Sequence, residues 1–354
     1  MTPSTHRTLV HVVWVPFMIG ALLALIVATW SVGPASGARR RPRTSTTTSP
    51  VPMVPAPRPV GKLVPPRGAL LGAFVSSTGT GWTADDVTAR ETQLGRTFDI
   101  DHRFQNWTTH FPTPADGWDV QNGRIPMVTW QPDTTNLDTI NVGANDDLIR
   151  ARAHDVATFG QPMFLRFAHE MNADWYPWDG VNNNTAGRHD GPAKYIVAWR
   201  HVHDLFVAAG ATNAVWVWCP NRTSLPNAAW NRAQNYYPGD AYVDWVCIDG
   251  YNRDAMHWRS FTTLFSTVSA ASAAYAARKP IMIGETSSVE GGAAKKAAWI
   301  DDAAVAMQQR FPSIAAFVWF DTQKNGFDFR IDSSASSFQA FRSLALSSYF
   351  RTRA

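Results

Sequence analysis

Two glutamates, each placed at the end of an apolar run, are the residues best suited to chemistry. Glu170 ends the run P-M-F-L-R-F-A-H-E, and Glu285 ends the run K-P-I-M-I-G-E. Two carboxyl groups that flank a glycosidic bond can cleave it, because one protonates the leaving oxygen while the other attacks the anomeric carbon or activates water. A single glutamate could as well form a strand-end salt bridge or a helix cap. Two in matching positions favour a catalytic pair.

Other catalytic and metal-binding motifs do not fit the sequence. The segment H-E-M-N-A at residues 169–173 resembles the start of a zinc-protease motif, but Ala173 stands where the second histidine would be. No Gly-x-Ser-x-Gly sequence supports a serine triad. Cys219 and Cys247 have no CxxC or zinc spacing and fall in neighbouring predicted strands, so we expect buried free thiols rather than a disulfide. We expect no cofactor and no metal.

The elements that would position the glutamates alternate between two kinds of segment. Eight short apolar runs, nearly continuous as in parallel strands covered on both faces, are separated by loops and segments of helical period. The runs are residues 70–75, 98–104, 125–130, 162–168, 214–219, 243–248, 280–284 and 315–320. This pattern predicts a (β/α)8 TIM barrel with its chemistry at the C-terminal ends of the strands. An open doubly wound sheet would bring a Gly-rich loop after its first strand, and none is present.

Three of the predicted helices have clear sequence patterns. Asp146 is the expected cap of a helix whose apolar positions follow helical spacing and which Gly160 ends. A second apolar stripe occupies residues 196–206 and is closed by Gly210. A third stripe, at residues 261–275, predicts one further helix.

The N-terminal part of the chain differs from the rest. Residues 1–38 contain a 22-residue apolar run, typical of a signal peptide or a signal-anchor transmembrane segment. Residues 39–67 begin with R-R-R-P-R and continue as a Pro/Thr/Ser-rich stretch, which predicts a disordered linker. We therefore expect export, with residues 68–354 as a monomeric catalytic domain, secreted or anchored to the cell membrane by the N-terminal segment alone. Cleavage and retention of the leader are both open.

The basic character of the chain belongs to this leader. Eight of the 32 Lys and Arg residues, and none of the 28 Asp and Glu residues, lie in residues 1–68. Residues 69–354 therefore carry 24 basic and 28 acidic residues, a net charge of −4. The predicted domain gives no electrostatic reason to bind nucleic acid.

Aromatic residues gather at the same strand ends as the glutamates. Trp175, Tyr176 and Trp178 follow Glu170, Tyr251 ends the sixth predicted strand and Trp319 lies near the end of the eighth. A flat pyranose face stacks well on an aromatic ring, so these positions are candidates for a sugar-binding cleft. Trp216 and Trp218, inside the fifth strand, are expected to pack in the core.

Together these motifs resemble glycoside hydrolase family 26, whose members are mostly endo-β-1,4-mannanases, with some β-1,3-1,4-glucanases and β-1,3-xylanases. The resemblance covers roughly residues 68–349. Its most specific part is R-F-A-H-E-M-N-A-D-W at residues 166–175, which is similar to the family's R-x-x-H-E-M-N-G-x-W. The segments at residues 236–251 and 280–285 add to it, with a weaker match at 318–320.

The resemblance implies a retaining mechanism with Glu170 as acid/base and Glu285 as nucleophile. It further implies that His169 binds near the sugar at the −1 subsite, that Tyr251 donates to Glu285, that Trp319 lies beneath the −1 sugar and that Trp175 lines the cleft. Burial and the charge of Glu285 are expected to raise the pKa of Glu170. The full set of expected substrate-binding residues is Arg166, His169, Asn172, Trp175, Trp178, Tyr251, Trp319, Trp130 and Gln131.

The substrate expected from the resemblance is a β-linked polysaccharide, in the first place β-1,4-mannan. Two departures stand out: Ala173 replaces the family's glycine, and Trp130-Gln131 stands where many mannanases have Trp-His. The second departure leaves β-1,3-1,4-glucan and β-1,3-xylan as alternatives. A non-catalytic glycan-binding barrel is disfavoured because a binder needs neither carboxylate. A transglycosylase would use the same residues.

Overall fold

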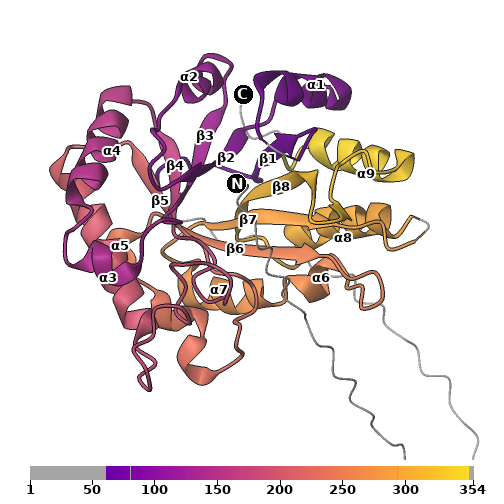
Figure 1. The fold of residues 1–354 in the computed structure, drawn as a ribbon. Coiled ribbons are helices and arrows are strands. Elements are labelled where there is room, and N and C mark those ends of the chain that lie inside the picture. Colours follow the sequence, from indigo (N-terminus) through magenta and orange to yellow (C-terminus); the bar gives the residue numbers. More distant parts are fainter. Residues whose placement is uncertain (1–60, 80, 293, 351–354) are drawn as a thin grey trace, which may run out of the picture. The chain divides into compact units, whose positions relative to one another are not determined.

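Eight parallel strands close on one another in the computed structural model, which describes residues 61–79, 81–292 and 294–350 (Figure 1). Each strand pairs with the next along the chain, and β1 also pairs with β8, which confirms the predicted (β/α)8 TIM barrel. The strands are β1 (Leu70–Ser76), β2 (Ile100–Asn106), β3 (Ile125–Gln131), β4 (Met163–Phe167), β5 (Ala214–Trp218), β6 (Trp245–Asn252), β7 (Ile281–Ser288) and β8 (Ile314–Lys324). A short strand, β9 (Phe327–Asp328), pairs antiparallel with the end of β8.

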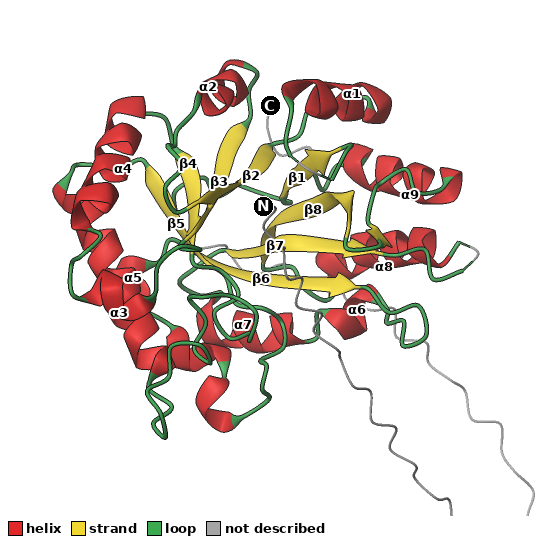
Figure 2. Cartoon of the chain, in the orientation of Figure 1, coloured by secondary structure: helices red, strands yellow, loops and turns green. Residues whose placement is uncertain are grey.

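Helices surround the strands on the outside of the barrel (Figure 2). They are α1 (Ala84–Leu94), α2 (Pro114–Gln121), α3 (Leu137–Asn141), α4 (Asp146–Phe159), α5 (Gly191–Ala208), α6 (Phe261–Leu264), α7 (Thr267–Tyr275), α8 (Lys295–Gln309) and α9 (Ala335–Leu346). Gly160 ends α4 with a φ of 68°, as predicted, whereas the N-cap is Asn145, one residue before the expected Asp146.

The third apolar stripe forms two helices instead of the single predicted one. Between α6 and the first turn of α7, the backbone amides of Ser266, Val268 and Ser269 donate to carbonyls three residues back, so the chain is wound more tightly where the two helices meet. Phe265, at the break, is fully buried.

Side chains alternate between the barrel interior and the layer of helices. On β8, Ala316 and Val318 belong to the apolar cluster inside the barrel, while Phe317 and Trp319 pack in the cluster between strands and helices. This period of two is a property of every strand. Adjacent residues at a strand end therefore point to different sides, one toward the barrel interior and the other toward the helices.

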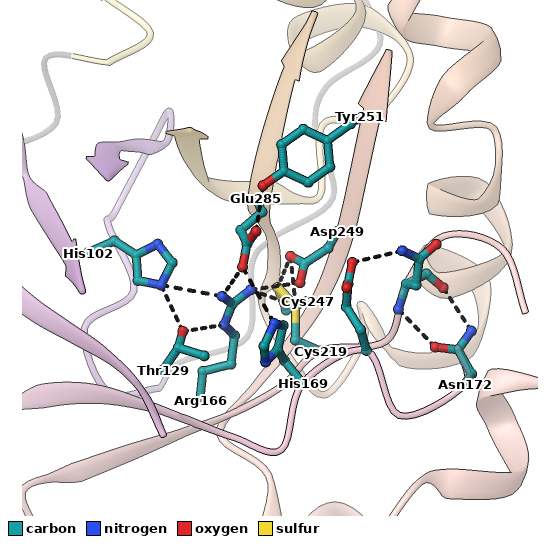
Figure 3. The surroundings of a disulfide bond; sticks show 12 residues. His102, Thr129, Arg166, His169, Asn172, Cys219, Cys247, Asp249, Tyr251 and Glu285 are labelled. Carbon is teal, nitrogen blue, oxygen red and sulfur yellow. Dashed lines mark hydrogen bonds and ion pairs between the residues drawn. A yellow bond between two sulfur atoms is a disulfide. The ribbon is translucent and has the colours of Figure 1, made fainter. Parts of the chain in front are cut away.

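Cys219 and Cys247 form a disulfide, so the expectation of free thiols was wrong. Cys219 directly follows β5, and Cys247 lies on the neighbouring strand β6 (Figure 3). Both face the interior cluster, and their Cα atoms are only 4.3 Å apart. The two strands thus bring the sulfur atoms together inside the barrel.

Gly284 on β7 packs directly against this disulfide. A Cβ atom at this position would lie 2.2 Å from Cys247 Sγ and 2.9 Å from Asp249 Oδ1. We therefore expect Gly284→Ala to lower the free energy of unfolding by about 1–3 kcal/mol, because the extra atom overpacks a closed interior. Urea denaturation followed by fluorescence would measure the change.

Gly117 on α2 offers the matched control. An added Cβ there would meet no atom within 4 Å, so Gly117→Ala should leave the free energy of unfolding unchanged or raise it through better helix propensity. Equal stabilities for the two variants would show that the barrel interior at Gly284 is looser than described.

The apolar run and most of the linker lie outside the described residues. Their expected roles as leader and spacer therefore stay predictions. Within the part of the chain that the structure describes, no helix is long and apolar enough to cross a membrane.

Candidate active site

The C-terminal ends of the strands open into a cavity of about 990 Å³ that contains both glutamates. Glu170 follows β4, and Glu285 lies on β7. The residues around them come from β1, β2, β3, β6, β8 and the adjoining loops. They include Phe74, Trp82, Phe104, Gln131, Trp175, Tyr176, Tyr251, Arg253, Phe320 and Phe329. The sequence rule that chemistry lies at the C-terminal strand ends holds for this cavity.

Both oxygens of Glu285 have a hydrogen-bond donor. The guanidinium of Arg166 donates to Oε1, and the hydroxyl of Tyr251 donates to Oε2 at 2.5 Å (Figure 3). Arg166 also pairs with Asp249 Oδ2 at 2.7 Å. Together these contacts fix the orientation of the Glu285 carboxylate.

Arg166 keeps its charge although it is completely buried. Burial alone would lower its pKa, but the carboxylates of Asp249 and Glu285 hold the pKa above the ordinary arginine value. Its Nε also donates to Thr129 Oγ1 at 2.7 Å. The guanidinium thus forms a fixed support beneath the cavity (Figure 3).

Glu170 is held from three sides. Its backbone has a φ of 53°, a left-handed conformation that is unusual for a residue with a side chain and is concentrated at functional sites. Its amide donates to Cys219 O at 2.7 Å. Its carboxyl oxygens accept from Asn221 Nδ2 at 2.7 Å and from Trp175 Nε1 at 3.1 Å.

The surroundings of Glu170 suit a group that holds a proton at neutral pH. Burial and the negative charge of Glu285 raise the pKa of Glu170 to about 7, while the hydrogen bond from Asn221 and the charge of Arg166 act in the opposite direction. The direction agrees with the sequence expectation. One carboxyl group of the cavity is thus suited to donate a proton, and the other, Glu285, accepts hydrogen bonds from the Arg166 guanidinium and the Tyr251 hydroxyl.

We expect kcat/KM to fall about tenfold per pH unit above pH 7, because a general acid must carry its proton in the free enzyme. The pKa of Glu170 is raised to about 7, so the protonated form predominates below that pH and is lost above it. Asn221→Ala removes a hydrogen-bond donor to the charged form of Glu170. The decline of kcat/KM on the alkaline side of the pH profile, called the alkaline limb below, should therefore move to higher pH.

The pH profile would be measured on a soluble substrate, with Asn213→Ala as control. Asn213 donates to Val156 O and Gln161 O, away from the cavity, and its loss should leave the limb in place. An alkaline limb that is the same in wild type and Asn221→Ala would contradict the assignment to Glu170.

Three of the expected substrate-binding residues line the cavity. Trp175 is 42% exposed, Tyr251 reaches Glu285, and Gln131 ends β3 with its side chain facing the opening. Their positions allow direct contact with a bound sugar.

Three expected tryptophans lie elsewhere. Trp130, Trp178 and Trp319 are at most 1% exposed and belong to the core cluster between strands and helices. Their indole nitrogens donate to the carbonyls of Trp107, His169 and Phe329, respectively. The expectation that Trp319 lies beneath the sugar is not met in position. The alternation of side chains along a strand explains why Trp130 and Trp319 point away from the cavity, since the following residue on each strand faces it.

Arg166, His169 and Asn172 are buried one layer behind the cavity wall. Asn172 donates to Asn221 O and accepts from Asn221 N, so it positions the residue that holds Glu170. His169 Nε2 is 3.8 Å from Glu285 Oε1. Burial and the charge of Arg166 lower the pKa of His169 well below its ordinary value, so the ring is neutral.

Sequence reasoning missed several residues that line the cavity or hold Glu170. Phe104 and Phe320 line the cavity, and Asn221 donates to Glu170. All three lie at or just after predicted strands, and the strand-end rule applied to every strand would have found them. Phe329 had no such signal, because its place depends on the hairpin of β8 and β9.

One group near the site has the donor types of a metal centre. Potential ligand atoms of Cys219, Cys247 and Asp249 lie within 4.8 Å of one another. The two sulfur atoms are bonded to each other, whereas a cysteine binds zinc as a thiolate. In this state the group does not form a ligand set.

Comparisons with known proteins point to one glycoside hydrolase family. The family model described as "Glycosyl hydrolase family 26" matches residues 93–332. The chain is 37% identical over 287 residues to Endoglucanase H of Acetivibrio thermocellus, covering 78% of this chain and 30% of that protein. It is 24% identical over 147 residues to a mannan endo-1,4-β-mannosidase of Bacillus subtilis, covering 41% of this chain and 36% of the relative. The chain thus spans only about a third of the length of these relatives.

Solved structures share the fold. A β-mannanase of Bacteroides ovatus aligns with a TM-score of 0.61 at 16% identity, covering 80% of this chain and 90% of that one. A modular endo-β-1,4-mannanase of Cellulomonas fimi gives 0.58 at 18% identity, covering 80% and 71%. At these identities the likeness concerns the barrel alone. The match of the family model over most of the barrel shows that the chain belongs to glycosyl hydrolase family 26.

Proposed function

We propose that this chain is a retaining endo-β-glycanase in which Glu170 is the acid/base and Glu285 the nucleophile. The observation that carries the proposal is the contrast between the two carboxyl groups of one cavity. Burial and the neighbouring charge raise the pKa of Glu170 to about 7, whereas Arg166 and Tyr251 donate to both oxygens of Glu285. This is the division of roles that double displacement needs.

In the first step, Glu285 attacks the anomeric carbon and forms an ester with the sugar. The bond from that carbon to the glycosidic oxygen breaks, and the proton of Glu170 passes to the leaving oxygen. Tyr251 and Arg166 keep Glu285 oriented for the attack.

In the second step, water replaces the ester. Glu285 carries no charge in the ester, so one of the causes that raise the pKa of Glu170 is removed. Glu170 then accepts a proton from the attacking water, and Glu285 leaves as a carboxylate. The same pair therefore supplies the acid for one step and the base for the next.

Two adjoining hollows near the glutamates support endo action. A second hollow of about 450 Å³ shares Trp175, Tyr251 and Arg253 with the main cavity. A polymer that runs from one hollow to the other passes the catalytic pair in mid-chain.

The comparisons support two backbone sugars. β-1,4-Mannan is supported by several relatives named as mannan endo-1,4-β-mannosidases. A β-glucan is favoured by the longer match to Endoglucanase H and by Gln131 on the cavity wall, where many mannanases have histidine.

The test is incubation of the full chain with β-mannan, mixed-linkage β-glucan, β-1,3-xylan and carboxymethyl cellulose, followed by reducing-end measurement. Cleavage of one polymer, with a product whose new anomeric centre is initially β by NMR, supports the proposal and identifies the backbone. Failure to cleave any of them would overturn it and would favour a glycan-binding barrel.

We also propose that the apolar run near the N-terminus directs export. Support comes from its length and from the Pro/Thr/Ser-rich segment that follows. Mass spectrometry of the chain from medium and from membranes would test this, and a full-length chain confined to the cytoplasm would contradict it.

A further inference from the structure

The second hollow lies on the side of the acid/base. Trp175 and Asn221, whose side chains donate to the carboxyl group of Glu170, both line it. A general acid must reach the glycosidic oxygen of the departing sugar. The hollow therefore faces the sugars of the leaving group.

Three arginines, Arg222, Arg253 and Arg259, line this hollow. Among the described residues, none of the three guanidinium groups forms an ion pair with a carboxylate, and that of Arg253 lies 4.8 Å from the ring centre of Tyr251. Burial and the nearby charges of Arg259 and Arg253 lower the pKa of Arg222, so Arg222 lies close enough to the other two cations to be repelled by both.

The other charged groups of the hollow offset this cluster only in part. Asp254, which contacts His257 at 2.5 Å, is the one carboxylate among the residues that line the hollow, against three arginines. Two buried arginines at the main cavity are paired by contrast: Arg103, which lines it, and Arg166 each contact two or more carboxylates. The hollow is thus a positive region in a domain whose net charge is negative.

We propose that Arg222, Arg253 and Arg259 form an arginine subsite that binds an anionic group on the leaving-group side of the substrate. The substrate class is then a β-glycan whose sugars bear carboxylate or sulfate substituents. This inference rests on the proposed function and deepens it.

The chemistry of guanidinium groups supports this assignment. Their planar donors match the paired oxygens of carboxylates and sulfates, and charge-assisted hydrogen bonds are the stronger kind. An anion between like charges also relieves their mutual repulsion, and a positive cleft attracts anionic ligands from solution. A neutral polysaccharide would gain none of these terms.

The experiment compares matched polymers that differ in charge. The full chain is assayed on the carboxymethyl and hydroxyethyl derivatives of cellulose and of galactomannan at equal degrees of substitution, and on cellulose sulfate. The double variant Arg222→Gln/Arg259→Gln removes two charges. Arg253 is left in place because its charge acts on Glu170. Arg342→Gln, an exposed position on α9, is the matched control for the loss of a surface charge.

At low ionic strength, kcat/KM of the wild type should be about fivefold higher on the anionic derivative than on the neutral one. The double variant should lose this preference, the control should keep it, and 0.5 M NaCl should abolish it by screening. A higher rate on cellulose sulfate than on carboxymethyl cellulose would identify sulfate as the bound group, and the reverse would identify carboxylate.

Two results would overturn the arginine subsite: a wild type without preference for the anionic polymer, or a double variant that loses activity equally on both. Affinity electrophoresis in gels that contain each polymer separates this inference from the proposed function. Retardation by the anionic polymer that disappears in the double variant would support the subsite even if no polymer were cleaved. Absence of cleavage would then count against the glycanase alone.

Discussion

Glu285→Ala should lower kcat by about 10⁴- to 10⁶-fold, because without the nucleophile no glycosyl-enzyme can form. On an aryl β-glycoside of the identified backbone, azide should restore turnover in the space left by the carboxylate and yield the α-glycosyl azide. Glu170→Ala should lower kcat on the polymer by about 10²- to 10⁴-fold. With this variant, azide should attack the glycosyl-enzyme and yield the β-glycosyl azide. NMR of the products distinguishes the two anomers.

Glu290→Ala is the matched control for these variants. Glu290 follows β7 by two residues, but its carboxylate accepts from Ser333 and Ser337 and does not line the cavity. Its replacement should change kcat by less than about twofold. The assignment of the two roles would be reversed if the anomers of the two azide products were exchanged, and it would be lost if both variants kept wild-type turnover.

Arg166→Met should lower the free energy of unfolding by about 3–5 kcal/mol and abolish activity, because it leaves two buried carboxyl groups without their cation. Arg166 is fully buried and pairs with Asp249 and Glu285. Burial already raises the pKa of Asp249 well above its ordinary value despite this arginine. Without it, Asp249 should take up a proton, and uptake near neutral pH would be visible in the pH dependence of stability.

Arg150→Met gives the comparison with a surface pair. Arg150 pairs with Asp146 across one turn of α4, and about half of its side chain is exposed, so its loss should cost less than about 1 kcal/mol. Urea denaturation of both variants measures the difference. A further variant, Arg166→Met/Asp249→Leu, should recover part of the lost stability because it removes one of the two buried carboxyl groups that have lost their partner. Equal stabilities of Arg166→Met and Arg150→Met would contradict a buried ion pair.

The barrel could be predicted because its signal is local. Each strand is a short apolar run followed by a helical stripe, and the two glutamates end two such runs, so the positions of Glu170 and Glu285 at one opening follow from the fold class. The orientation of the aromatic residues is harder to predict. Trp130 and Gln131 are adjacent on β3, yet only Gln131 faces the cavity, and no composition rule tells which of two neighbours points inward.

Contacts between distant segments were beyond the sequence. Placing Cys219 and Cys247 on neighbouring strands was correct, but their bonding depends on both facing the interior at the same height. The hairpin that brings Phe329 to the cavity depends on pairing of Gln323 with Asp328. Neither feature has a periodic signature, since each is set by register between strands.

The position of the disulfide has a consequence for the stereochemistry of the reaction. The bond joins the end of β5, which continues to Asn221, the donor to Glu170, with β6, which carries Tyr251, the donor to Glu285. Whether the anomeric configuration is kept or reversed depends on the gap between the two carboxyl groups, about 5–5.5 Å for retention and wider where a water must fit. A covalent crosslink between the segments that carry both donors therefore restrains the spacing of the carboxyl pair, on which the configuration of the product depends.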